Sequence, residues 1–82
     1  MKVRVLYFAA VRELVGRDEE ALDLPGEVRT VGEFAAWIGA RHAGLAGRMG
    51  HVRVARNEMF AADGDALGEG DVLALIPPVA GG

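Results

Sequence analysis

Apolar and polar residues alternate at the start of the chain and predict a β-strand over residues 3–8. Both faces of this stretch (VRVLYF) carry apolar side chains, which is typical of a strand near the middle of a sheet. Residues 9–15 (AAVRELV) then predict a short helix that ends at Gly16. Residues 20–24 (EALDL) alternate again before a Pro-Gly turn, and they predict a second strand with one solvated face.

The clearest local signal is a helical period that begins at residue 30. Thr30 and Glu33 have the spacing of a capping box, in which each side chain bonds the backbone N–H of the other residue. The positions that pack this main amphipathic helix on the sheet then recur at helical spacing: Val31, Phe34, Ala35, Ile38 and, at the end, His42. Trp37 lies beside that stripe, and we expect it to cover the edge of the sheet. Three glycines between residues 44 and 50 indicate that the helix has given way to a loop.

Three more strands are predicted in the second half of the chain. Residues 52–56 form a short strand, Asn57 and Glu58 a tight turn, and residues 59–60 a minor returning strand. Residues 72–76 (VLALI) are apolar throughout, which is expected of a buried central strand. Because the first and last strands are the most apolar, we expect them to lie side by side and parallel at the centre of the sheet.

The predicted order of elements is therefore β–α–β–α–β–β–β, with one dominant helix after the second strand. A mixed sheet with one main helix laid across it, and a short helix after the first strand, is an α+β roll of the β-grasp type. The 82 residues contain no linker and no internal repeat. We expect one β-grasp domain over residues 1–78, followed by a flexible tail of residues 79–82.

Composition excludes several classes of protein. The chain contains no cysteine, which excludes disulfides, thiol catalysis and cysteine-ligated metals. Its net charge of −3 has the wrong sign for a protein that binds a nucleic-acid backbone. No apolar run approaches a membrane span, and the first residues enter a strand pattern rather than a signal peptide. We expect a cytoplasmic protein that binds neither nucleic acid nor membranes.

Candidate catalytic and metal-binding residues are few. His42 and His51 are the only histidines, and neither has a partner at metal-ligand spacing, so solvent-facing or helix-capping roles are favoured. There is no serine, and the only threonine, Thr30, is assigned to the helix cap, which leaves effectively no hydroxyl nucleophile. Carboxylates between residues 63 and 71 alternate with glycines but lack the spacing of a calcium loop, and turns explain them better.

The last residues of the sequence, IPPVAGG, are the remaining candidate for chemistry. Pro77 and Pro78 lack a backbone N–H, and they therefore end a β-ladder. The four residues beyond them reach about 13 Å when fully extended, which is long enough to enter the active site of another protein. Gly82 carries no side chain that would oppose such entry. An ordinary frayed terminus is the alternative, but the terminal carboxylate is the only credible reactive group.

Two stretches of the chain carry a family resemblance. Residues 5–16 (VLYFAAVRELVG) and 68–82 (GEGDVLALIPPVAGG) resemble the opening and the closing signatures of the small subunit of molybdopterin synthase, a family of ubiquitin-like β-grasp sulfur carriers. The helix start at residues 30–33 and Asn57 also fall where that pattern has equivalents. Ile76 departs from it, because the family often has Phe before the proline pair, and this bears on the details of the partner surface.

The resemblance implies a mechanism centred on Gly82. An E1-like adenylyltransferase uses ATP to convert the carboxylate to an acyl-adenylate, and a sulfur donor protein replaces the AMP to leave a thiocarboxylate. The tail then enters the large subunit of molybdopterin synthase, within a heterotetramer of two small and two large subunits. There it gives its sulfur to cyclic pyranopterin monophosphate, a step of molybdenum cofactor biosynthesis. The small subunit binds no cofactor and, lacking catalytic residues, is not itself an enzyme.

The same resemblance assigns roles to two groups of residues. The segment that threads the partner's active site consists of Val79, Ala80, Gly81 and Gly82. The residues at which the family contacts its partner are Phe8, Met59, Ile76, Pro77 and Pro78. For the three outside the proline pair, packing within the core is the competing interpretation.

Several alternative functions share the fold and the Gly-Gly end. Sulfur carriers of thiamine synthesis are typically shorter and lack a helix at residues 10–16, which argues against them. Carriers for tRNA thiolation and ubiquitin-like protein modifiers that form isopeptide bonds remain open. A β-grasp interaction module with an inert tail is the alternative of another class, and incubation with ATP and an adenylyltransferase distinguishes it, because only a carrier gains AMP or sulfur.

Overall fold

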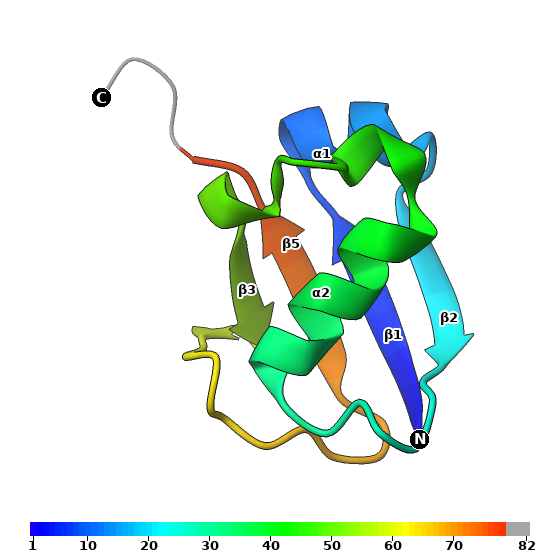
Figure 1. Ribbon diagram of the computed structural model, residues 1–82, viewed down its shortest axis with the longest axis vertical. Helices are drawn as coiled ribbons and strands as arrows, with labels where there is room; N and C mark the ends of the chain where they lie inside the picture. The colour runs from blue at the N-terminus through cyan, green and yellow to red at the C-terminus, as the bar shows by residue number, and fades with distance from the viewer. Residues whose placement is uncertain (79–82) are drawn as a thin grey trace.

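The fold is a five-stranded mixed sheet with one long helix across it, seen in a computed structural model that describes residues 1–78 (Figure 1). The strands are β1 (Lys2–Tyr7), β2 (Glu19–Asp23), β3 (Arg53–Arg56), β4 (Met59–Phe60) and β5 (Val72–Ile76). The helices are α1 (Ala9–Val15) and α2 (Val31–Arg41), with two short 3₁₀ turns, η1 (Ala43–Leu45) and η2 (Met49–His51). The predicted order of elements and the β-grasp fold are confirmed. The expected tail, residues 79–82, lies outside the described residues.

The sheet has the strand order β2-β1-β5-β3-β4. The first and last strands pair in parallel at its centre, from Arg4 opposite Val72 to Tyr7 opposite Leu75, as the sequence predicted. All other pairs are antiparallel. The crossover that parallel pairing requires runs through the whole middle of the chain, including α2.

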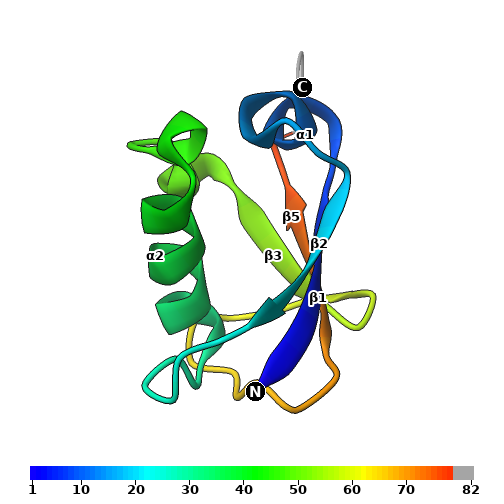
Figure 2. The same ribbon diagram turned by 90° about the vertical axis from the view of Figure 1, so that its right-hand side faces the viewer.

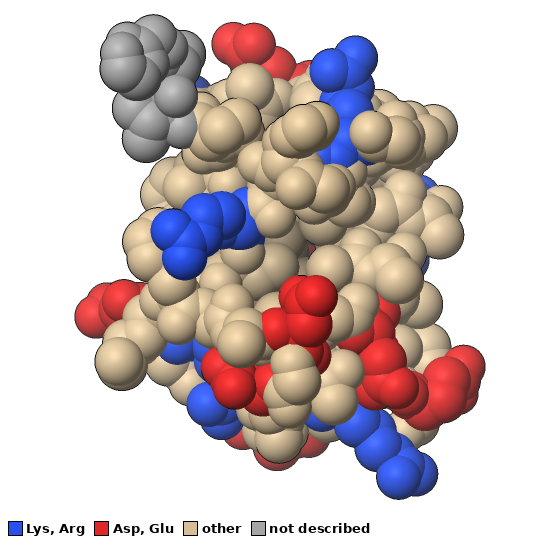
Figure 3. Space-filling view, turned by 60° about the vertical axis from the view of Figure 1, so that its left-hand side comes forward, with Lys and Arg blue, Asp and Glu red and all other residues tan. Residues whose placement is uncertain are grey.

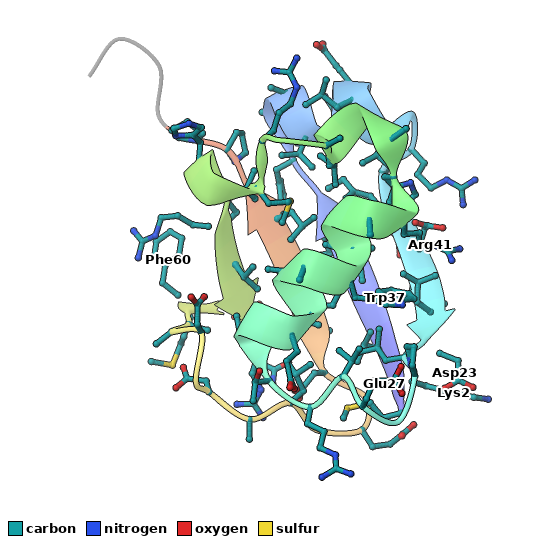
Figure 4. The ribbon with its side chains drawn as sticks, in the orientation of Figure 1. Lys2, Asp23, Glu27, Trp37, Arg41 and Phe60 are labelled. Carbon is teal, nitrogen blue, oxygen red and sulfur yellow. The ribbon has the colours of Figure 1, made fainter. Side chains whose placement is uncertain are left out.

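Helix α2 covers one face of the sheet (Figure 2). The predicted capping box is present: Glu33 N–H donates to Thr30 Oγ1 at 3.2 Å, and Thr30 N–H donates to Glu33 Oε1 at 3.1 Å. Phe34 and Ile38 are fully buried against the inward side chains of the strands. Trp37 points from α2 toward the edge strand β2, and the Arg41 guanidinium lies 5.6 Å from the centre of its ring (Figure 4).

Two expectations about burial need correction. Strand β5 was expected to be a buried central strand, but only Leu73 and Leu75 are fully buried, while its other residues are half-buried. The reason is that helix α2 covers one face of the sheet, and within residues 1–78 no helix lies over the opposite one (Figure 2). Strand β2 begins and ends one residue earlier than predicted, and Glu20 is buried beside the core rather than solvated. Its solvated residues are Glu19, Ala21 and Asp23.

Among residues 1–78, no helix is both long enough and apolar enough to cross a membrane.

Candidate partner-binding face and chain exit

The face of the sheet opposite α2, here called the outer face, is apolar along its central strands. Side chains of successive residues in a strand point to opposite faces, and residues paired across strands share a face. Tyr7 and Leu75 point inward, so Leu6, Ala74 and Ile76 point outward. A shallow groove of about 300 Å³ on this face is lined by Leu6, Phe8, Ala55, Glu58, Phe60, Val72, Ala74 and Ile76.

Two aromatic residues give the outer face its exposed apolar surface. Phe8 is 46% exposed and Phe60 is 56% exposed. Large apolar side chains grouped in solvent are typical of a surface that binds another protein, and aromatic residues often dominate the binding energy of such surfaces. The outer face therefore has the chemistry of an interface.

Phe8 is held on the outer face by the change from strand to helix. Its backbone is extended (φ −111°, ψ 148°), it precedes α1 as the N-cap residue, and its N–H donates to the Leu75 carbonyl at 3.3 Å. The next residue, Ala9, has a φ of 46°, which turns the chain sharply into the helix. Gly16 ends α1 with a φ of 88°, a conformation that glycine adopts without a steric penalty.

Strand β4 places its two residues on opposite faces. Phe60 pairs with Ala55 and so lies on the outer face, where the Arg53 guanidinium sits 3.8 Å from the centre of its ring (Figure 4). Met59 pairs with Arg56 and so points the other way, with 74% of its surface exposed. The resemblance named Met59 as a partner contact, whereas the register of β4 places Phe60 on the outer face. The register of β4 against β3, fixed by the Asn57–Glu58 turn, was the signal that could have separated them.

The turn between β3 and β4 has the left-handed geometry of a two-residue hairpin. Asn57 and Glu58 have φ values of 50° and 72°. The Asn57 side chain also ties the turn to β5, because its Oδ1 accepts from Val72 N–H at 2.9 Å and its Nδ2 donates to Asp71 Oδ1 at 3.0 Å. The outer face thus includes a hairpin fixed to the central strand.

Asp71 is the centre of that attachment. Its Oδ2 accepts from Arg56 Nε at 2.6 Å and from the Gly68 N–H at 2.7 Å. Burial by itself raises the pKa of Asp71, but the hydrogen bonds from Arg56, Asn57 and Gly68 outweigh burial and hold the pKa below its usual value. The carboxylate is therefore charged in the folded protein at neutral pH.

The chain leaves the sheet beside a hollow that residues of α1 and η2 line. Pro77 is half-buried and Pro78 is exposed, and both line a hollow of about 260 Å³ with Ala10, Val11, Leu14, Arg48, His51 and Val52. Figure 1 shows this exit at the end of the molecule opposite the N-terminus. The outer face and the exit adjoin, because Ile76 belongs to the groove and Pro77 to the hollow. The candidate reactive segment, Val79 to Gly82, lies outside the described residues.

A buried polar cluster on the other side of the sheet was not predicted. Glu20 Oε1 lies 2.6 Å from Tyr7 Oη and 2.7 Å from His42 Nε2, and Arg17 donates to Glu20 Oε2 at 3.0 Å. Burial raises the pKa of Glu20, but the hydrogen bonds from Tyr7 and His42 outweigh burial and keep it below its usual value. Burial and the bond to Glu20 raise the pKa of Tyr7, which stays neutral. This cluster joins the end of α2 to the sheet.

His42 therefore has a structural role. It is the C-cap residue of α2, which is one of the two roles that the sequence favoured. The other role, facing solvent, does not apply, because its side chain is only 17% exposed and contacts Glu20 and Tyr7. Contacts between residues 13 to 35 positions apart leave no local pattern in a sequence, so only the tertiary structure reveals them. Within residues 1–78 no three His, Asp or Glu side chains are grouped so that they could hold a metal ion.

Comparisons with known proteins agree with this geometry. The ThiS family matches residues 5–82 of the chain. The molybdopterin synthase sulfur carrier subunit of Escherichia coli is 40% identical over 82 residues, which cover 98% of this chain and 99% of that protein. The crystal structure of SAMP1 from Haloferax volcanii superposes with a TM-score of 0.84 at 33% identity, with both chains fully covered. A complex of subunits 1 and 2 of the molybdopterin-converting factor from Helicobacter pylori contains a chain that superposes with a TM-score of 0.71 at 26% identity, again with full coverage of both.

Proposed function

The chain belongs to the ThiS family, and on that premise we propose that it is the sulfur carrier subunit of a molybdopterin synthase. The observation that carries the proposal is the position of the apolar outer face directly beside the chain exit at Pro77 and Pro78. A carrier needs such an arrangement, because the surface that docks must hold the partner where the reactive end enters its active site. The E. coli relative is a sulfur carrier subunit by name, and the H. pylori relative is one half of a two-subunit complex.

The proposed chemistry takes place at the Gly82 carboxylate. An E1-like adenylyltransferase joins one carboxylate oxygen to the α-phosphorus of ATP and releases pyrophosphate. A persulfide on a donor protein then attacks the carbonyl carbon, and AMP leaves with the electron pair of the broken C–O bond. A thiol next attacks the donor-side sulfur of the resulting acyl disulfide, which forms a new disulfide and frees the carrier with one added sulfur. The product is a thiocarboxylate. Because a free carboxylate is a poor electrophile, activation by AMP is the step that makes a carrier without catalytic side chains sufficient.

In the proposal, the carrier gives up its sulfur inside the active site of a partner protein. In the proposal, residues 79–82 enter the large synthase subunit, and the sulfur passes to cyclic pyranopterin monophosphate. Two small and two large subunits make up the complex. The chain itself binds no cofactor and performs no turnover alone, and it acts in the cytoplasm, where ATP for adenylation is supplied.

The outer face is the proposed docking surface. Phe8 and Ile76 were expected there from the resemblance, and Phe60 joins them by its register. Pro77 and Pro78 stiffen the segment that leads away from this face, which lowers the entropy lost when the tail enters a channel. The same face serves the adenylyltransferase and the synthase subunit in turn, so the two partners compete for one carrier.

Sulfur stoichiometry tests the proposal. The dithiolene of molybdopterin contains two sulfurs, so two charged carriers are consumed for each pterin. Chemically thiocarboxylated protein is mixed with the large subunit and the pterin precursor in the absence of ATP, and product is counted per carrier. The proposal predicts one product for every two carriers. Many products per carrier would mean that the sulfur comes from another source.

A second candidate function is protein modification. It is favoured by the similarity to SAMP1, the small archaeal modifier protein 1 of Haloferax volcanii. A modifier would transfer the activated Gly82 carboxyl group to amines of other proteins, whereas a synthase subunit would return as the free carboxylate after each sulfur transfer. If the thiocarboxylated protein yields no product with a competent large subunit, the modifier or tRNA-thiolation branch is favoured instead.

A further inference from the structure

The chain carries very few primary amines. Of its nine lysine and arginine residues, Lys2 is the only lysine and the other eight are arginines. A guanidinium stays protonated at any physiological pH and is not an acyl acceptor. The N-terminal amine of Met1 is engaged, because it donates to the Leu24 carbonyl at 3.2 Å and lies 3.5 Å from Asp23 Oδ1. Lys2, whose side chain is exposed, is thus the more accessible of the two amines.

Lys2 lies too far from the chain exit for the protein to acylate itself. Arg4 pairs with Val72 in the parallel register, so Lys2 lies two residues before that pair and Pro78 six residues after it. Eight residues along parallel strands span about 26 Å. A four-residue tail reaches about 13 Å, and the five bonds of a lysine side chain, about 1.5 Å each, do not make up the difference. The longest dimension of the molecule, 36 Å, lies along this direction (Figure 1).

The surroundings of Lys2 and those of the chain exit also differ in charge. Lys2 is surrounded by acidic residues: Asp23 is its partner in the strand register, Glu69 accepts from its backbone N–H at 3.1 Å, and Glu27 lies nearby (Figure 4). Figure 3 shows most of the visible Asp and Glu in the lower half of the molecule, where several Lys and Arg also lie. At the chain exit, by contrast, Arg48 lines the hollow with the proline pair, and Arg53 pairs with Ile76. Acidic side chains beside Lys2 and arginines beside the chain exit favour a head-to-tail approach of two copies.

We infer that Lys2 is an acylation site that accepts the activated Gly82 carboxyl group of a second copy of this chain, which yields head-to-tail conjugates and no self-cyclised monomer. The inference rests on the proposed function in one respect, since it needs an activated Gly82. In the reaction, the neutral Lys2 Nζ attacks the carbonyl carbon of the acyl-adenylate and forms a C–N bond. The C–O bond to AMP breaks, AMP leaves with the electron pair, and the proton from nitrogen passes to water.

The test uses protein in which Gly82 is a chemically prepared alkyl thioester, so that no adenylyltransferase is involved. The thioester protein is incubated over a range of protein concentrations, and products are followed by intact mass and by peptide mapping. We expect dimers linked from Gly82 to Lys2, with a yield that rises with concentration. After hydrolysis of the thioester that remains at the free end, their mass is twice that of the acid form less one water. Lys2→Arg should abolish the linkage.

Matched variants test the role of distance. In a Lys2→Arg background, Arg48→Lys puts the sole lysine beside the proline pair and should give a cyclic monomer, lighter than the acid form by one water, at a rate independent of concentration. Arg29→Lys in the same background puts it at the α2 entry, where Leu67 N–H donates to the Arg29 carbonyl, and should give no cyclic monomer.

Three outcomes would overturn the inference: a wild-type cyclic monomer linked at Lys2, dimers that persist in Lys2→Arg, or no conjugate from wild type while Arg48→Lys cyclises. None of them bears on sulfur loading, which is measured separately with ATP and the adenylyltransferase. Failure of the proposed function appears there, as absence of AMP or sulfur on Gly82, and so the two failures are distinguishable.

Discussion

Single residues of the outer face divide into those that pack within the fold and those that remain in solvent. Phe8 and Phe60 expose about half of their surface, and Ile76 is half-buried between the groove and the chain exit. Side chains that pack within the fold contribute to the free energy of unfolding, whereas exposed side chains contribute to the free energy of binding when a partner covers them. The distinction between the two kinds can be measured for each residue.

Phe60 is expected to contribute to partner binding more than to stability. Replacing Phe60 with Ala should weaken binding to the large synthase subunit by at least about 1–2 kcal/mol, the range of an aromatic hot spot. Its neighbour Met59 is the matched control, because the register of β4 turns it to the opposite face. Isothermal titration calorimetry of Phe60→Ala and Met59→Ala compares the two. Equal losses of affinity would show that the outer face is not the interface.

Ile76 is predicted to act at the interface as well as in the sheet. Ile76→Ala should reduce affinity by at least about 1–2 kcal/mol, with a smaller change in unfolding free energy than a core truncation produces. Leu75→Ala supplies the comparison, because Leu75 is fully buried, and its truncation should cost about 2–5 kcal/mol of stability. Denaturant midpoints and affinities are measured on both variants. A large midpoint loss with unchanged affinity for Ile76→Ala would assign it to the core.

Elements of this fold are positioned by a few polar contacts in addition to apolar packing. The capping box fixes the start of α2, the Glu20 cluster fixes its end, and Asp71 ties the β3–β4 turn to β5. The capping box could be predicted because both partners lie within four residues. Apart from those to Arg17 and Gly68, the contacts of Glu20 and Asp71 join residues 13 or more positions apart. An acidic residue in a strand or turn pattern looks solvated in the sequence alone.

Stability is predicted to fall in acid because of Asp71 and Glu20. Both carboxyls have a folded-state pKa below the unfolded value, so their contribution is present above the unfolded pKa and is lost as pH falls through the folded one. Unfolding free energy should therefore decline below about pH 4, near the ordinary carboxyl pKa. Asp71→Asn should lower stability at neutral pH by about 1–3 kcal/mol, and should flatten the decline.

The control for this prediction is Asp63→Asn, which removes the same charge from an exposed position. It should retain the full acid dependence, because Asp71 and Glu20 remain. Chemical denaturation between pH 2 and 7 measures all three proteins. If Asp71→Asn and the wild type lost stability in parallel as pH fell, the Asp71 network would not be a source of the acid sensitivity.

At the scale of the whole molecule, the fold brings a docking face and the chain exit to one region and keeps the only lysine at the far end. The parallel central pair followed from the apolar strands at residues 3–8 and 72–76. The uncovered outer face did not follow, because an apolar run in a strand is the same whether a helix or a partner protein covers it. Phe60 was missed for a related reason, since one residue of register decides its face.

The measurement that tests the central claim most directly is the mass of the protein after loading. The purified chain is incubated with its E1-like adenylyltransferase, ATP and a sulfur donor, beside a variant that lacks Gly82. The account predicts that the intact chain exchanges one oxygen for one sulfur at Gly82, and that the truncated variant, equally stable in thermal unfolding, exchanges none. An intact chain that gains neither AMP nor sulfur, or a truncated variant that still gains sulfur, would contradict the carrier mechanism.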